Sequence, residues 1–184
     1  MTRLEAALSY ARLGWRVLPV VPNGKLPATA HGVKDATTDE EVITRWFATR
    51  DDLNIGIATG AESGIVVFDI DPRNGGTQSW EAFVDELGAV PDGAMQLTAG
   101  GGVHHVAAFA EGVRSCKLRN GVDLLADGRY FVAYPSTIEG RAYHWELSSD
   151  PLEGVAPFVV PERWLPAVVA PKRAASSVVG ASLI

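Results

Sequence analysis

Apolar positions recur at intervals of three and four residues in three stretches of the chain, which is the pattern of amphipathic helices. These stretches lie at residues 2–14, 38–47 and 76–88, and a brief fourth helix is predicted at 161–169. The first two open with the spacing of a capping box, Thr2 with Glu5 and Thr38 with Glu41. Gly14 and Gly88 are expected to end the first and third helices, because glycine readily adopts the conformation that follows a helix.

Short apolar segments, several of them alternating with polar residues, predict β-strands in the rest of the chain. In the first half they lie at residues 15–21, 55–59 and 65–71. From residue 95 onward they dominate, at 95–98, 103–109, 121–125, 130–134 and 143–147. Because helices and strands do not alternate regularly, the sequence favours an α+β fold, with mixed or antiparallel sheets flanked by helices, over a doubly wound fold.

The same pattern divides the chain into an N-terminal αβ lobe at about residues 1–62, a β-rich lobe at about 63–168, and a linker or tail at 169–184. A long polar loop at 23–34 contains Lys25 and His31. The last stretch is rich in small residues and serine and has no periodicity, as is typical of a linker. We therefore expect one globular unit, residues 1–168, that leads to further domains outside this chain.

Composition limits the cellular setting. The chain has 184 residues, enough for one full-sized domain, and 47% of them are hydrophobic. With one cysteine, Cys116, and four histidines, neither a disulfide framework nor a clustered zinc site is expected. No apolar stretch reaches the roughly 20 residues needed to cross a bilayer, and no signal segment is evident. We expect a soluble protein of the cytoplasm without membrane association.

The formal net charge of -6 argues against a nucleic-acid binder that works through a basic surface alone. Phosphate contacts normally come from clustered lysines and arginines. A metal-dependent nucleotide enzyme is compatible with this charge, because its cations shield the phosphates and its acidic residues serve as their ligands.

Two carboxylates close the apolar strand at residues 65–71. Strand side chains alternate with a period of two, so Asp69 and Asp71 point to the same side. Their repulsion favours a bound divalent cation, and oxygen ligands suit magnesium or manganese. The alternative is a strand that runs into an ordinary Asp-Pro turn, which Pro72 and the glycines at 75 and 76 would support.

Two glycine-containing segments follow. The run Gly100 to Gly102 precedes His104 and allows a ligand to approach backbone N–H groups closely, but a hairpin turn with a structural histidine has the same pattern. In the second segment, Asp123 follows Gly121 on a predicted strand between apolar residues. A charge is costly there without a partner, and a metal held by Asp69 and Asp71 would be one.

These motifs occur in an order, Asp-x-Asp, Gly-Gly-x-His and Gly-Val-Asp, that resembles the N-terminal domain of bifunctional DNA primase/polymerases (Prim-Pol) in the archaeo-eukaryotic primase superfamily. The resemblance covers about residues 4–147. Further matching segments are 14–15, 24–27, 31–38, 54–60, 69–73 and 130–136. The chain departs from the family pattern at Val103, where a basic residue usually precedes the histidine. This departure makes His105 an alternative to His104.

The resemblance implies a fold and a set of site residues. The fold would be a primase-like core with an N-terminal αβ unit and a β-rich, RRM-like catalytic half. The resemblance also implies that Asp69, Asp71 and Asp123 bind two Mg²⁺ or Mn²⁺ ions and that His104 contacts the incoming nucleotide. We expect the remaining charge of the triphosphate to be balanced by four basic residues, Lys25, Arg73, Lys117 and Arg119.

The implied activity is nucleotidyl transfer, in which a 3'-hydroxyl attacks the α-phosphate of an NTP or dNTP under the direction of a template. The implied partners are single-stranded DNA template, primer, and C-terminal helical and helicase domains of a phage, plasmid or bacterial replication protein. Two alternatives stay open on the sequence. One is a nucleotide-binding module without catalysis, and the other is a nucleotide-sugar transferase, which also uses an Asp-x-Asp pair.

Overall fold

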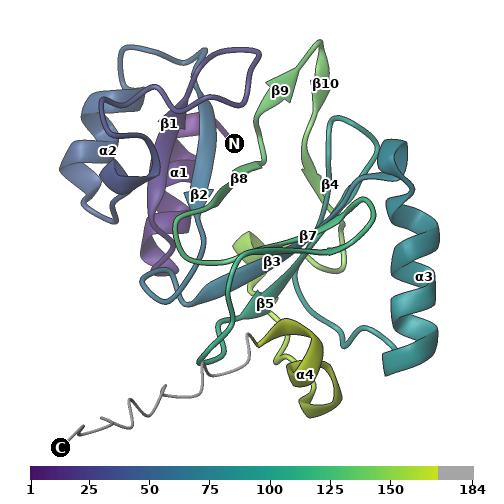
Figure 1. The fold of residues 1–184 in the computed structure, drawn as a ribbon. Coiled ribbons are helices and arrows are strands. Elements are labelled where there is room, and N and C mark those ends of the chain that lie inside the picture. The colour runs from purple at the N-terminus through teal and green to yellow at the C-terminus, as the bar shows by residue number, and fades with distance from the viewer. Residues whose placement is uncertain (170–184) are drawn as a thin grey trace, which may run out of the picture.

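The computed structural model describes residues 1–169, and these form two antiparallel sheets that share a core with two N-terminal helices, while two further helices cover the other face of the larger sheet (Figure 1). The helices are α1 (Arg3–Arg12), α2 (Glu40–Phe47), α3 (Gly76–Leu87) and α4 (Leu165–Val168). The smaller sheet has the order β1 (Val17–Val20), β2 (Asn54–Ala58) and β8 (Tyr130–Ala133). The larger has the order β11 (His144–Trp145), β4 (Met95–Leu97), β5 (Val103–Ala108), β3 (Ile65–Ile70), β7 (Val122–Leu125) and β6 (Cys116–Arg119). A hairpin of β9 (Thr137–Ile138) and β10 (Arg141–Ala142) stands apart from both. The α+β class with antiparallel sheets is thus confirmed.

The helix starts show where capping signals are reliable. In α1 the predicted capping box is present, because the Thr2 hydroxyl accepts the Glu5 N–H and the Glu5 carboxylate accepts the Thr2 N–H. The box predicted at Thr38 is wrong. The cap of α2 is Asp39, whose carboxylate accepts two backbone N–H groups of the first turn. An aspartate next to a threonine offers the stronger acceptor at this position, since an ionised cap also interacts favourably with the helix dipole.

The two faces of β3 have different neighbours. Ile65 and Val67 belong to the core that joins the larger sheet to the smaller one and to α1 and α2. Val66, Phe68 and Ile70 belong to a second core with α3 and α4. Asp69 therefore lies on the face that is turned toward the smaller sheet, at the end of β3 where that packing stops.

Three strands are absent from the sequence prediction: β6, β9 and β10. They are only two to four residues long, too short for a periodic pattern to give a clear strand signal. The strand predicted at 130–134 is present as β8, but it pairs with β2 and so completes the sheet of the N-terminal half. Most of the predicted linker at 169–184 lies outside the described residues.

In the part of the chain that the structure describes, no helix has both the length and the apolar character to cross a membrane. The longest, α3, has 12 residues.

Candidate active site

A row of polar side chains crosses the larger sheet from one strand to the next. Its members stand directly opposite each other in the strand register: Lys117 on β6, Asp123 on β7, Asp69 on β3, His104 on β5 and Gln96 on β4. Residues paired in this way lie on the same face, with Cβ atoms roughly 5 Å apart. Burial increases along the row, from the exposed Lys117 and Asp123 through the half-buried Asp69 to the buried His104 and Gln96.

The register brings together residues that are far apart in the sequence. Asp69 has Asp123 on one side and His104 on the other. The predicted convergence of Asp69, Asp123 and His104 is therefore present at the level of the backbone. It arises because β3 is central in the sheet and pairs with both β5 and β7.

The carboxylate of Asp69 faces the imidazole of His104, whose Nε2 lies 3.4 Å from Asp69 Oδ1. Burial opposes ionisation of this carboxyl and by itself would raise its pKa. The contact with His104, together with the positive charge of Lys25, outweighs burial and holds the pKa of Asp69 below its usual value. Asp69 is therefore a carboxylate near neutral pH and presents negative charge to the pocket.

The structure distinguishes the two neighbouring histidines. His104 is 5% exposed and lies on the face of Asp69, with its ring edge-on to Phe131. His105 points to the opposite face, where its ring stacks on Trp80 of α3 at 5.3 Å. Burial, and secondarily the neighbouring His104, lower the pKa of His105 to about 4. Of the two, His104 is the histidine that the pocket can use.

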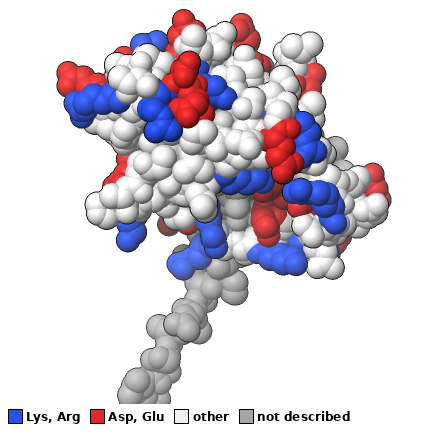
Figure 2. Space-filling view, turned by 90° about the horizontal axis from the view of Figure 1, so that it is seen from above, with Lys and Arg blue, Asp and Glu red and all other residues white. Residues whose placement is uncertain are grey.

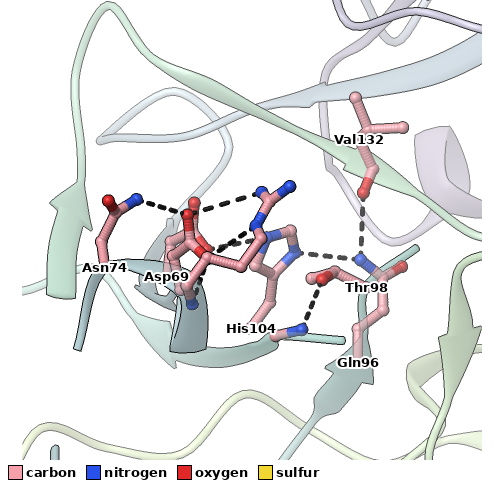
Figure 3. Close-up of polar contacts among 9 residues, drawn as sticks. Asp69, Asn74, Gln96, Thr98, His104 and Val132 are labelled. Carbon is pink, nitrogen blue, oxygen red and sulfur yellow. Dashed lines mark hydrogen bonds and ion pairs between the residues drawn. The ribbon is translucent and has the colours of Figure 1, made fainter. Parts of the chain in front are cut away.

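Gln96 is a residue that the sequence analysis did not single out. Its side chain is fully buried, and its Nε2 lies 3.0 Å from His104 Nδ1 and 3.0 Å from the carbonyl oxygen of Val132. Its Oε1 accepts the N–H of Tyr134 at 2.8 Å. Figure 3 shows the His104 ring between Asp69 and this amide. Only the strand register places this glutamine beside the histidine, and the register cannot be read from the sequence.

Asp71 follows the end of β3 and turns toward its own loop. Its carboxylate accepts the backbone N–H of Arg73 at 3.0 Å, the Arg73 Nε at 3.2 Å and the Asn74 Nδ2 at 2.8 Å. Burial alone would raise the pKa of the Asp71 carboxyl. The hydrogen bonds from Arg73 and Asn74 have the opposite and larger effect, so the pKa lies below its usual value. The Asp-Pro turn considered from the sequence is thus present, with Asp71 as its cap.

Backbone contacts hold this turn in place. The Asp71 N–H donates to the carbonyl of Gly121 at 2.8 Å, and a Cβ added at Gly76 would lie 2.3 Å from the same carbonyl. Only glycine fits at residue 76, since real Cβ atoms do not approach so closely. The Asp71 loop therefore rests directly on the hairpin that carries Asp123.

A pocket opens over Asp69 and encloses about 330 Å³, part of it continuous with solvent. Its polar lining consists of Lys25, Asp69, Asp71, Arg73, Thr98, His104 and Tyr143. A neighbouring hollow of about 710 Å³ shares Lys25, Asp69, His104 and Tyr143 with it and adds Arg129. Tyr143 and Arg129 were not predicted. The Gly100–Gly102 turn forms one wall, and there the N–H groups of Gly101 and Gly102 are already bonded to Thr98.

The four predicted basic residues lie in different places. Lys25 and Arg73 line the pocket, and Lys117 extends the polar row beside Asp123. Arg119 lies toward α3, where its guanidinium contacts Glu86 at 2.6 Å and covers the ring of Phe83. The register of β6 shifts between Lys117 and Arg119, and such a bulge turns the following side chain away from the face it would otherwise share.

These features agree with a comparison with known families. A model of the family described as bifunctional DNA primase/polymerase, N-terminal (Prim-Pol), matches residues 7–158. The chain belongs to this family. A comparison with curated proteins gives no match. The Prim-Pol match spans both sheets and every residue of the polar row, and at the level of the family it implies primase/polymerase-type nucleotidyl transfer for this domain.

The Prim-Pol site has the donor types for a divalent cation, but they do not surround one point. Carboxylate oxygens are the ligands that magnesium and manganese prefer, and Asp69 and Asp123 offer them from neighbouring strands. Among residues 1–169, no three acidic, histidine or cysteine side chains lie close enough together to hold a metal ion. The Asp71 carboxylate is bonded instead to Arg73 and Asn74. The carboxylates of Asp69 and Asp123 are ligands of the right type for such a cation and lie on one face of the sheet. Asp71 could join them only after its bonds to Arg73 and Asn74 are broken.

One face of the Prim-Pol domain is mixed in charge. On the described part of the face in Figure 2, basic and acidic side chains alternate and no broad area is basic alone. This agrees with the net charge of -6.

Proposed function

We propose that this Prim-Pol domain extends a 3'-hydroxyl with NTP or dNTP on a single-stranded DNA template, as part of a phage, plasmid or bacterial replication protein. The observation that carries the proposal is the register of β7, β3 and β5, which sets Asp123, Asp69 and His104 side by side on one face of the sheet, with Asp69 and His104 in the lining of one pocket. The order of these antiparallel strands also supports the primase-like core with an RRM-like catalytic half that the sequence resemblance implies.

In this proposal Asp69, Asp71 and Asp123 hold two Mg²⁺ or Mn²⁺ ions. The ions, when bound, would make the attacking hydroxyl more acidic and neutralise charge on the phosphates. The depressed pKa of Asp69 and of Asp71 supports this role, because both side chains are ionised ligands near neutral pH without a further proton loss. Asp71 would exchange its bonds to Arg73 and Asn74 for the cation. No zinc is involved.

The phosphates of the nucleotide are bound by groups around the Asp69 pocket. His104 donates from its pocket-facing nitrogen, while Lys25 and Arg73, which also line the pocket, supply positive charge. Lys117 serves the same purpose from the exposed end of the polar row. Arg119 contributes only after it leaves Glu86, so we give it a minor role.

Template and primer lie outside this pocket. The net charge of -6 and the mixed face in Figure 2 indicate few phosphate contacts, so we expect binding to single-stranded DNA to be weak and to fall steeply with salt. We propose that C-terminal helical and helicase domains contribute the remaining affinity.

The test is primer synthesis and extension on single-stranded DNA, with NTP and dNTP compared in Mg²⁺ and in Mn²⁺. We expect template-dependent extension by the wild-type domain, and its loss in the double variant Asp69→Ala with Asp71→Ala. Asp85→Asn is the matched control, because Asp85 is an exposed carboxylate on α3. Extension that survives the double substitution would refute the assignment of the site.

One observation favours a second candidate, a nucleotide-binding module without catalysis. Because Asp71 is bonded to Arg73 and Asn74, it does not join Asp69 and Asp123 in a cluster of metal ligands. This is expected of a site that binds a nucleotide without catalysing its transfer. This candidate predicts nucleotide binding without extension under every condition of the test above. The nucleotide-sugar transferase considered from the sequence has no such support, and the family match favours primase/polymerase chemistry over it.

A further inference from the structure

Gln96 has a more specific role than filling the core. We propose that Gln96 is a positioning residue that keeps the proton of the His104 ring on Nε2, the nitrogen that faces the pocket. The assignment of His104 as the phosphate donor rests on the proposed function, whereas the placement of the proton rests on hydrogen bonds within the chain.

The orientation of the Gln96 amide is fixed by the backbone of β8 and the residue that follows it. The N–H of Tyr134 can only donate, so the amide atom 2.8 Å from it must be the oxygen. The carbonyl of Val132 can only accept, so the atom 3.0 Å from it must be the nitrogen. A flipped amide would oppose donor to donor and acceptor to acceptor in a fully buried site, at the cost of both bonds.

This orientation decides the tautomer of His104. Of the two hydrogens on Gln96 Nε2, one is donated to Val132 and the other points at His104 Nδ1, 3.0 Å away. Nδ1 must therefore accept, which leaves the ring proton on Nε2. Nε2 is the atom that lies 3.4 Å from Asp69 and borders the pocket.

The consequence is a fixed hydrogen-bond donor at the position where a phosphate oxygen would bind. With the proton on Nδ1, a lone pair on Nε2 would face that oxygen and repel it. Gln96 also connects β4 of the larger sheet to β8 of the smaller one, so the donor is set by the packing of the two sheets on each other.

The first experiment reads the tautomer directly from the ¹⁵N chemical shifts of the four histidines in the wild-type protein, with His104→Gln to assign the His104 signals. We expect His104 Nε2 to carry the proton and Nδ1 to have the shift of an unprotonated nitrogen. A proton on Nδ1, or an even mixture of the two tautomers, overturns the proposal. This measurement needs neither nucleotide nor catalysis, so it stands even if the proposed function fails.

The second experiment changes the donor opposite Nδ1. In Gln96→Glu the carboxylate still accepts the Tyr134 N–H but has no hydrogen for Nδ1, so we expect a proton on Nδ1 of His104. In Gln96→Met no polar group remains at this position, so the ring is expected to populate both tautomers. Gln78→Glu, on the exposed surface of α3, is the control and should leave the His104 signals unchanged. An unaltered His104 tautomer in both Gln96 variants overturns the proposal.

The third readout is the split between KM and kcat for dATP in primer extension. Loss of one fixed hydrogen bond to a charged phosphate should raise KM about tenfold in Gln96→Met, with a smaller change in kcat. A purely structural role would instead lower the amount of folded enzyme, which changes apparent kcat and leaves KM unaltered. An unchanged KM in a folded Gln96→Met variant whose tautomer has shifted refutes the positioning role.

Discussion

Replacing His105 with phenylalanine tests the assignment of the two histidines to opposite faces of the sheet. The His105 ring is stacked on Trp80, and its pKa is lowered to about 4, mainly by burial and secondarily by the neighbouring His104. In the unfolded chain a histidine has a pKa of about 6.5. The unfolded chain therefore binds more protons between these two values, and neutral His105 stabilises the fold fully above pH 6.5 and progressively less as the pH falls to 4.

The size of the effect follows from the two pKa values. A shift of about 2.5 pH units corresponds to about 3 kcal/mol in the free energy of unfolding, of which about 2.5 kcal/mol is lost by pH 4.5. Phenylalanine does not titrate, so His105→Phe removes this loss. At pH 7.5 we expect the variant and the wild type to differ by less than about 1.5 kcal/mol, because the replacement ring can still pack on Trp80.

The assay is urea unfolding of wild type and variant at several pH values between 7.5 and 4.5. The difference between the two curves cancels the carboxylates that both proteins share. As the pH falls over this range, we expect the free energy of unfolding of His105→Phe to rise by about 2.5 kcal/mol relative to that of the wild type. The control is His144→Gln at an exposed position, whose curve should run parallel to that of the wild type. Parallel loss of stability in wild type and His105→Phe would show that His105 is not buried as a neutral ring, and the reasoning would fail.

Three further predictions concern the site and the loop that carries Lys25. Asp123→Asn should reduce primer extension at least about 100-fold without lowering the melting temperature, because Asp123 is exposed; a loss of both would indicate a structural role instead. Arg73→Ala removes a hydrogen-bond partner of the Asp71 carboxylate, so the affinity for Mn²⁺ measured by calorimetry should rise severalfold. The KM for dATP should also rise, because a positive charge in the pocket is lost. An unchanged Mn²⁺ affinity would contradict the bonding of Arg73 to Asp71. Asn54→Ala removes three hydrogen bonds of the Asn54 side chain, which donates to the carbonyls of Gly24, next to Lys25, and of Thr137 and accepts the Thr137 N–H; the free energy of unfolding should therefore fall by about 3 kcal/mol and the melting temperature by roughly 6 to 12 °C. A shift within about 1 °C would refute that estimate.

The sequence predicted the elements whose signals are local. The capping box at Thr2, the helix at residues 76–87 and the β-rich second half are confirmed, because each depends on periodicity or on caps a few residues apart. The match of the chain to Prim-Pol over residues 7–158 likewise confirms the family resemblance that the ordered motifs indicated. The error at Thr38 shows the limit of such signals, since two adjacent residues can both serve as caps and only the backbone geometry selects Asp39.

The tertiary structure decided which side chains meet. The sequence alone placed Asp69 and His104 in the site, but left His105 as an alternative and gave no reason to consider Gln96. Strand register settles both points, because a shift of one residue moves a side chain to the other face of a sheet. For the same reason a bulge in β6 turns Arg119 toward α3, which no periodicity in the sequence predicts. Local patterns thus determine where strands form, whereas the pairing of distant strands determines what the site contains.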